Sequence, residues 1–214
     1  MKPAAARVIE EHPFAPVLPP QATVMMMGTF PPPPARRCMD FHYPNFNNDM
    51  WRIYGQVFFG DAAHFQVPGE KRFDAARIRA FLEEAGIALC PTVRRAIREK
   101  GNAADAFLTV VQTVDLPRTL AAVPRCHTLL TTGGKATEVL LGLLPPGPDG
   151  RALKAPPTGG HLAFELAGRR LQLHRLPSTS RAYPLPFAEK ARIWAAFFHA
   201  CGLLPRLKQS HTSF

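Results

Sequence analysis

Short apolar runs and amphipathic segments alternate between residues 23 and 204 of this sequence. Residues 23–28 are apolar, end in glycine and follow a proline-rich entry, which is typical of a short buried strand. Similar short runs occur at residues 87–90, 107–111 and 126–131. Segments with apolar residues at helical spacing lie between them, so we expect strands and helices to alternate.

The expected helices combine apolar residues three and four positions apart with a capping or terminating residue. Asn48 and Asp49, for example, can cap the helix that follows them. The helical segments are residues 50–57, 73–84, 116–122, 136–144 and 187–203. Residues 161–166 and 170–176 flank Ala167-Gly168-Arg169 and predict a β-hairpin.

This alternation predicts an α/β fold, a three-layer α/β/α sandwich around a short, mainly parallel central sheet. Residues 1–22 contain five prolines and are expected to be an irregular N-terminal arm. Residues 23–204 are expected to form a single domain, and residues 205–214 a polar C-terminal tail. Residues 91–106 show no clear pattern, and their basic side chains are typical of a solvated face.

Three loops of unusual composition follow predicted strands: residues 28–49, 132–135 and 177–186. In parallel α/β folds, ligands bind beyond the carboxyl ends of the strands. We therefore expect the three loops to converge on one site.

Composition narrows the class of protein. The chain has 214 residues, of which 46% are hydrophobic and 20% charged, so a disordered chain is excluded. The most apolar stretch, residues 193–204, is too short for a membrane span of about 20 residues. Residues 1–18 have no apolar core of the kind found in secretory signals, so we expect a cytoplasmic protein without membrane association.

The formal net charge is +10, from 26 basic and 16 acidic residues. Such an excess attracts polyanions, and nucleic acid is the obvious candidate partner. The cysteines form no CxxC pair; they are Cys38, Cys90, Cys126 and Cys201. This spacing favours a reduced protein with no required metal or cofactor, although four distant cysteines could also bind an iron–sulfur cluster.

The first loop carries the densest candidate chemistry. Gly28 would let a ligand approach the backbone, where the N–H groups near Thr29 and Phe30 could bind a carbonyl oxygen. Tyr43 could stack on a flat base, and Asn48 could pair with an amide-like edge. The alternative is that the aromatic residues are core and the asparagines form turns. For any single residue this structural interpretation is the better one, but for the cluster as a whole we favour a binding pocket.

The other two loops have anion-binding character. The hydroxyls of residues 178–180 beside Arg181 suit a phosphate backbone, although an ordinary Ser/Thr turn would look similar. Gly133-Gly134-Lys135 opens a predicted helix, where free N–H groups favour an anion. HExxH, GxSxG and GxGxxG motifs are absent, and no two histidines have a metal-binding spacing.

Taken in order, these motifs resemble the uracil-DNA glycosylase superfamily. They are Gly28-Thr-Phe-Pro, Tyr43-Pro with Asn48-Asp-Met-Trp51, Gly-Gly-Lys135, and Leu176-Pro-Ser-Thr-Ser180 before a helix with Lys190 and Trp194. The chain is most similar to the mismatch-specific and hypoxanthine-type branches. The resemblance implies a DNA glycosylase that flips a deaminated or mismatched base, uracil or hypoxanthine, and hydrolyses its N-glycosidic bond without a cofactor. A monomer is the default expectation.

The resemblance also implies roles for individual residues. Asn48 matches a catalytic asparagine, while Gly28, Thr29, Phe30 and Tyr43 match the base-binding positions. Ser178, Thr179, Ser180 and Arg181 match a loop that grips the DNA backbone, and Lys135 is expected to bind DNA as well.

Two positions depart from the family pattern. Phe30 stands where many members have a catalytic Asp or Asn, and Leu176 replaces a His or Asn that donates to the leaving base. His174 could substitute for that donor, and Asp49, Asp61 or His64 could assist Asn48. The departures leave two alternatives: a non-catalytic DNA-binding or damage-sensing relative, and an enzyme that acts on free nucleosides or nucleotides.

Overall fold

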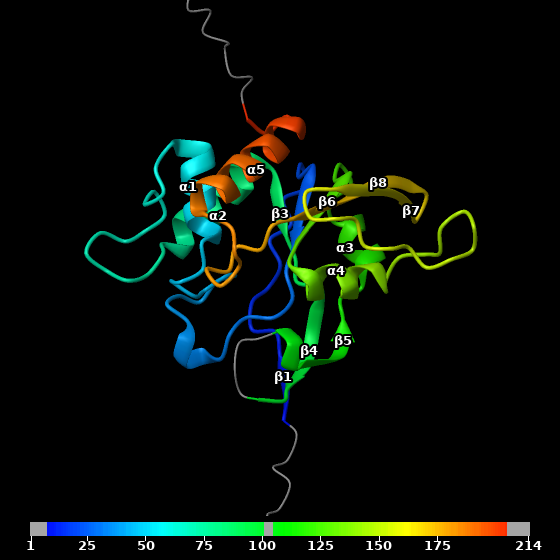
Figure 1. Ribbon diagram of the computed structural model, residues 1–214, viewed down its shortest axis with the longest axis horizontal. Helices are drawn as coiled ribbons and strands as arrows, with labels where there is room; N and C mark the ends of the chain where they lie inside the picture. Colours follow the sequence, from blue (N-terminus) through cyan, green and yellow to red (C-terminus); the bar gives the residue numbers. More distant parts are fainter. Residues whose placement is uncertain (1–7, 101–104, 205–214) are drawn as a thin grey trace, which may run out of the picture.

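The computed structural model describes residues 8–100 and 105–204, so the predicted C-terminal tail lies outside the described residues. Its centre is a five-stranded sheet with the order β3-β2-β6-β8-β7 (Figure 1). All neighbouring pairs are parallel except β7 and β8, which form the predicted hairpin. The strands are β2 (Val24–Met27), β3 (Ile87–Leu89), β6 (Thr128–Thr132), β7 (His161–Leu166) and β8 (Arg169–Leu176).

Helices cover both faces of this sheet, and β2 shows how the chain separates the two cores. Val24 and Met26 pack with α1 (Met50–Phe59), α2 (Ala75–Ala85) and α5 (Phe187–Ala200) on one face. Met25 and Met27 pack on the other face, with α3 (Leu116–Ala121) and α4 (Gly134–Leu141). Successive strand residues point to opposite faces, so a strand buried on both sides is apolar throughout. The predicted three-layer α/β/α fold is confirmed.

A second sheet was not predicted. It is antiparallel, with the order β1-β4-β5, and contains β1 (Ile9–Glu11), β4 (Val93–Arg98) and β5 (Leu108–Thr113). The strand expected at residues 107–111 therefore exists, but it belongs to this sheet and not to the central one. β4 was missed because only Val93 and Ala96 of its six residues are buried, which leaves no clean alternation.

Residues 8–22 of the expected N-terminal arm pack on the domain and include a strand, so this part is not irregular, while residues 1–7 lie outside the described residues. Besides β1, the described part of the arm contributes three buried apolar side chains, Phe14, Val17 and Ala22. Val17 exchanges two backbone hydrogen bonds of 2.8 Å with Leu89. The local sequence could not indicate this pairing, because the two segments lie far apart in the chain.

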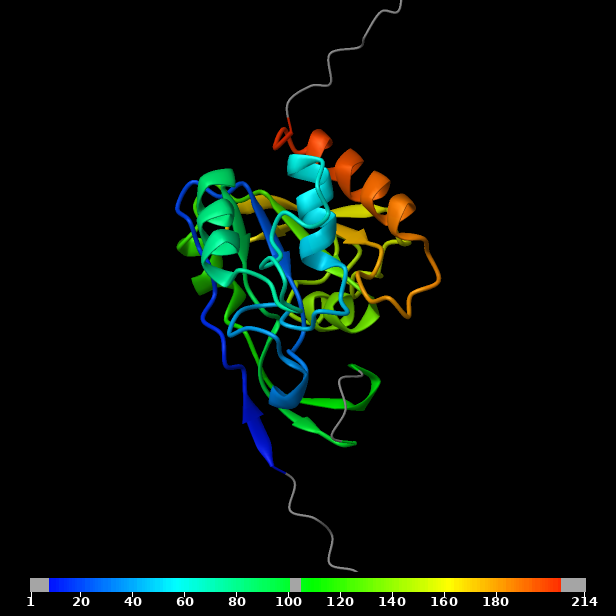
Figure 2. The same ribbon diagram turned by 90° about the vertical axis from the view of Figure 1, so that its left-hand side faces the viewer.

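The second sheet lies beyond the carboxyl ends of the central strands (Figure 2). β3 ends at Leu89 and β4 begins at Val93, so one sheet leads directly into the other. Thr92 fixes the junction, since its backbone N–H and its hydroxyl both donate to the carbonyl of Gly28, at 2.7 and 2.9 Å. The small sheet therefore forms one side of the region where ligands bind in such folds.

Candidate functional site

A cavity of about 360 Å³ lies at the carboxyl ends of β2 and β6. Pockets of this size accommodate small organic ligands. All three predicted loops contribute to its lining, which confirms that they converge. The predicted site residues among the lining are Gly28, Thr29, Phe30, Tyr43, Asn48, Ser178, Thr179 and Ser180.

Asn48 lies in the turn that leads into α1. Its side-chain oxygen accepts a hydrogen bond of 2.9 Å from the backbone N–H of Met50, which helps to satisfy the start of the helix. Its side-chain NH₂ group has no acceptor among the described residues. Asn48 therefore presents a donor to the cavity while its oxygen is occupied.

Backbone pairing joins the Asn48 turn to the serine-rich loop after β8. Asn48 and Ser180 form an isolated β-bridge. Next to it, the N–H of Asp49 donates to the carbonyl of Thr179 at 2.9 Å. The pairing brings the two most motif-rich segments of the sequence together, although 132 positions separate Asp49 from Arg181.

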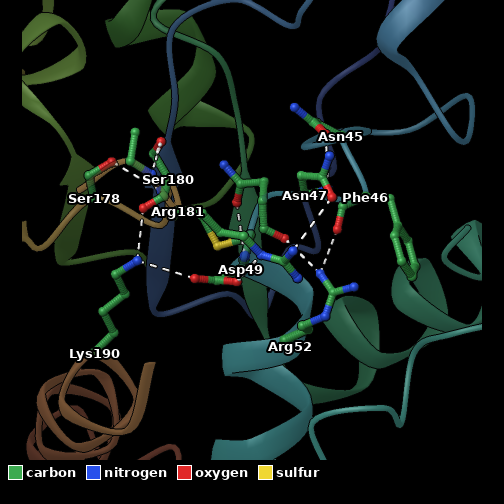
Figure 3. Close-up of polar contacts among 12 residues, drawn as sticks. Asn45, Phe46, Asn47, Asp49, Arg52, Ser178, Ser180, Arg181 and Lys190 are labelled. Atoms are coloured by element: carbon green, nitrogen blue, oxygen red, sulfur yellow. Dashed lines mark hydrogen bonds and ion pairs between the residues drawn. The ribbon is translucent and has the colours of Figure 1, made fainter. Parts of the chain in front are cut away.

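A buried ion pair holds this junction from below (Figure 3). The two oxygens of Asp49 meet Lys190 of α5 and Arg181, each at 3.2 Å. The Lys190 ammonium also donates to the carbonyl of Ser180 at 2.8 Å. Because the side chains of Asp49 and Lys190 are 8% and 2% exposed, each charge depends on the other for compensation. Asp49 thus positions the two loops, and both of its oxygens are occupied.

Tyr43 lies directly over Gly28. A Cβ atom added to Gly28 would be 2.6 Å from the Tyr43 hydroxyl oxygen, closer than real contacts allow. The sequence suggested that this glycine makes room for a ligand, but in the structure Tyr43 fills the space. Trp51 contacts the same ring edge-on, with the ring centroids 6.3 Å apart.

Two further features show how Tyr43 is held. Its φ angle is 51°, a left-handed backbone conformation that is costly for a bulky residue. Burial of the hydroxyl raises the pKa of Tyr43 to about 12, so the ring stays neutral. Strain of this kind persists where the surroundings impose it, and it is frequent at functional sites.

Phe30 belongs to the small sheet's apolar cluster as well as to the cavity. It packs against Val93, Ala96 and Leu108. The ring of His12 meets it edge-on, with the ring centroids 5.4 Å apart. An aromatic residue at this position is explained by the cluster beneath it.

Thr29 points to a residue that sequence reasoning missed. Its hydroxyl donates to a carboxylate oxygen of Asp105 at 2.9 Å, and Asp105 also lines the cavity. Burial raises the pKa of the Asp105 carboxyl group, against the opposing effects of Thr29, Lys135 and Arg98. Asp105 falls in the stretch without periodicity, and no motif signals it, so only the tertiary fold reveals it.

The two predicted DNA-binding cations lie outside the cavity lining. Lys135 is in the first turn of α4 and pairs with Glu138 at 3.0 Å. Arg181 is half-exposed and pairs with Asp49. Thr179, expected to contact DNA, has a buried side chain.

The histidine proposed as a substitute donor does not line the cavity, whereas two others do. His174 stacks on His161 at 4.9 Å, away from the cavity lining, and burial lowers its pKa to about 4. It therefore does not take the place of the donor missing at Leu176. His12 and His42 do line the cavity, and burial lowers their pKa values to about 3 and about 4, which keeps both rings neutral.

The two other residues considered as helpers of Asn48 lie elsewhere. Asp61 and His64 border a separate surface hollow. The Asp61 carboxylate accepts a hydrogen bond from the N–H of Ala63 at 2.8 Å, and the His64 ring stacks on Phe59 at 3.7 Å. Both residues therefore have local structural partners.

Within residues 8–100 and 105–204, no three side chains of the metal-binding types gather closely enough to hold a metal ion. In that same part of the chain, no helix combines the length and the apolar character required to cross a membrane.

Comparison with known proteins supports the fold. No protein-family model and no curated protein matches this sequence. The structure is similar to a solution NMR structure from Methanosarcina acetivorans, described as a "putative Uracil DNA glycosylase". The TM-score is 0.57 at 18% sequence identity, over 91% of this chain and 99% of that one. The chain thus has the fold of a uracil-DNA glycosylase-like protein.

Proposed function

We propose that the protein is a DNA glycosylase that excises a deaminated or mismatched base, uracil or hypoxanthine. The observation that carries the proposal is the cavity in which Tyr43, Asn48 and the loop from Ser178 to Ser180 meet. A ring for stacking, an amide donor and a hydroxyl-rich rim are what a flipped nucleotide requires. The similar fold of the archaeal protein adds support.

Base binding uses groups that remain unpaired in the structure. The backbone N–H groups of Thr29 and Phe30 have no acceptor among the described residues, and each can donate to a base carbonyl. The half-buried Tyr43 ring provides a stacking surface. Negative charge develops on the base as its glycosidic bond breaks, and donors fixed in advance stabilise that charge.

Asn48 acts through its NH₂ group. Since its oxygen is bonded to the Met50 N–H, the side chain is held in place and donates either to the base or to the attacking water. Loss of one such fixed donor typically raises the barrier by about 2.7–4 kcal/mol. Asn48→Ala should therefore slow excision by about a hundred- to a thousandfold.

DNA binding follows from charge and from the rim. Ser178 and Ser180 line the cavity, Arg181 follows them in the chain, and all three can contact the phosphates next to a flipped nucleotide. Lys135 adds positive charge at the start of α4. With a net charge of +10, binding should weaken steeply as salt rises.

The test is a base-excision assay with labelled duplexes and single strands that carry uracil, hypoxanthine, xanthine, or thymine opposite guanine. Hot alkali reveals the abasic product. Asn47→Ala is the matched control for Asn48→Ala, because Asn47 is exposed and does not line the cavity. Cleavage that is lost only in Asn48→Ala supports the proposal.

Other results of the same assay point to the alternatives. Tight DNA binding without any abasic product favours a damage-sensing protein. Cleavage of free nucleosides, insensitive to salt, favours a small-molecule enzyme.

A further inference from the structure

The cavity needs a proton acceptor that Asn48 does not provide. Hydrolysis of a glycosidic bond requires water to lose a proton as it attacks the sugar. The Asn48 oxygen already accepts the Met50 N–H, and an amide is in any case a poor base. Another group at the cavity can serve as the acceptor.

Asp105 is the one carboxylate among the described lining residues. It begins the short 3-10 helix Asp105–Phe107, and the Thr29 hydroxyl holds one of its oxygens at 2.9 Å. The second oxygen has no protein donor among the described residues, so it can accept a hydrogen bond from water. His12 and His42 also line the cavity, but each uses a ring nitrogen on a backbone carbonyl of the N-terminal arm.

We infer that Asp105 is the general base that activates the hydrolytic water, an inference that rests on the glycosylase activity proposed above. The water oxygen forms a bond to C1′ of the sugar while the C1′–N bond breaks. The electron pair of that bond leaves with the base, and the water proton moves to Asp105. Solvent then protonates the departing base and takes the proton from Asp105.

The electrostatic surroundings suit this role. Burial raises the pKa of Asp105 above its ordinary value, which makes the carboxylate a better proton acceptor. The charged groups that oppose this shift are Lys135 of α4 and Arg98 of β4, together with the Thr29 hydroxyl. Tyr43, also nearby, stays neutral. Burial thus makes the carboxylate a stronger proton acceptor, while Thr29, Lys135 and Arg98 favour its ionised form.

The arrangement also accounts for the small sheet. The 3-10 helix that begins at Asp105 leads directly into β5, and Phe30 packs on Leu108 at the start of that strand. Because β4 pairs with β5, the Asp105 carboxylate lies near the carboxyl end of β2, where it accepts a hydrogen bond from the Thr29 hydroxyl. A residue 76 positions away from Thr29 becomes its neighbour in this way.

The test measures the single-turnover excision rate as a function of pH. In the wild-type protein, the rate should rise with pH through the pKa of Asp105 and then level off, because the ionised form is active. Asp105→Asn should lower the plateau by about 10²–10⁴-fold and remove the rise. Asp40→Asn is the matched control: it makes the same charge change at an exposed loop position and should retain the wild-type rate and profile.

Thr29→Val provides a second measurement that does not depend on the folding of Asp105→Asn. The Thr29 hydrogen bond lowers the pKa of Asp105, so its loss should move the rising limb to higher pH. The assignment would be overturned if the rise of the excision rate occurred at the same pH in Thr29→Val as in the wild type. It would also be overturned if the rise were still present in Asp105→Asn.

The outcomes separate the two proposals. A wild-type protein that excises no base refutes the proposed function itself. A wild-type protein that excises a base, with an Asp105→Asn variant of equal rate, refutes only the role of Asp105.

Discussion

The two sides of the cavity are held by different forces. The loop wall, formed by Asn48, Thr179 and Ser180, is joined by backbone pairing and by the buried Asp49–Lys190 ion pair. The sheet wall, formed by Thr29, Phe30 and Asp105, rests on a small apolar cluster and a single hydroxyl–carboxylate hydrogen bond. A buried ion pair demands its full geometry, whereas a small cluster tolerates change. We therefore expect single substitutions to destabilise the loop wall strongly and the sheet wall only mildly.

The largest effect should come from breaking the buried pair of the loop wall. Lys190→Met leaves Asp49 buried with only the half-exposed Arg181 as partner, and it should lower the free energy of unfolding by about 3–5 kcal/mol. Urea denaturation measures this loss. Lys190→Met combined with Asp49→Asn should regain part of the stability, because no unpaired carboxylate remains. A double variant no more stable than the single one would show that the charge is not the cause.

Tyr43 lies between the two walls, and its truncation should be the next largest effect. Tyr43→Ala removes the stacking surface and should weaken binding to a strand with a flipped base by about 1–3 kcal/mol. Binding titrations with an abasic strand as reference isolate the contribution of the base. Tyr43→Phe keeps the ring and should bind nearly as well. An unchanged affinity in Tyr43→Ala would mean that this ring only packs against Gly28.

The sheet wall should respond more mildly. Phe30→Ala removes a partly buried ring, and since full burial of such a side chain contributes about 1.5–3 kcal/mol, the loss of stability should be about 1 kcal/mol. Thermal unfolding measures it. The dependence of the excision rate on pH should change even so, because the loss of the Phe30 ring loosens the cluster that positions Asp105. A profile identical to wild type would separate Phe30 from the catalytic wall.

The smallest effect on folding should come from Arg181. Its pair with Asp49 is half-exposed, and exposed pairs contribute about 0.2–1 kcal/mol. Arg181→Ala should instead reduce the slope of log affinity against log salt concentration by about 1, the value expected for the loss of one phosphate contact. A slope equal to that of the wild type would remove Arg181 from the DNA interface.

Sequence patterns predicted the loop wall much better than the sheet wall. Asn48 lies at the start of a helix, and the run from Ser178 to Ser180 follows a strand with alternating apolar residues, so both carry local signals. Asp105 has none, since it follows an aperiodic stretch and gains its partner Thr29 only through strand pairing. The role expected of Gly28 was also incomplete, because a neighbour as distant in sequence as Tyr43 fills the space above it.

The sequence by itself indicated the layered fold, since short unbroken apolar runs such as residues 24–27 are typical of strands buried on both faces. It also determined which three loops meet, because parallel strands end at the same edge. The tertiary structure decided the rest: the second sheet, the docking of the N-terminal arm, and the arrival of Asp105 beside Thr29. Those features depend on pairing between segments far apart in the chain, for which local hydrophobic periodicity carries no information.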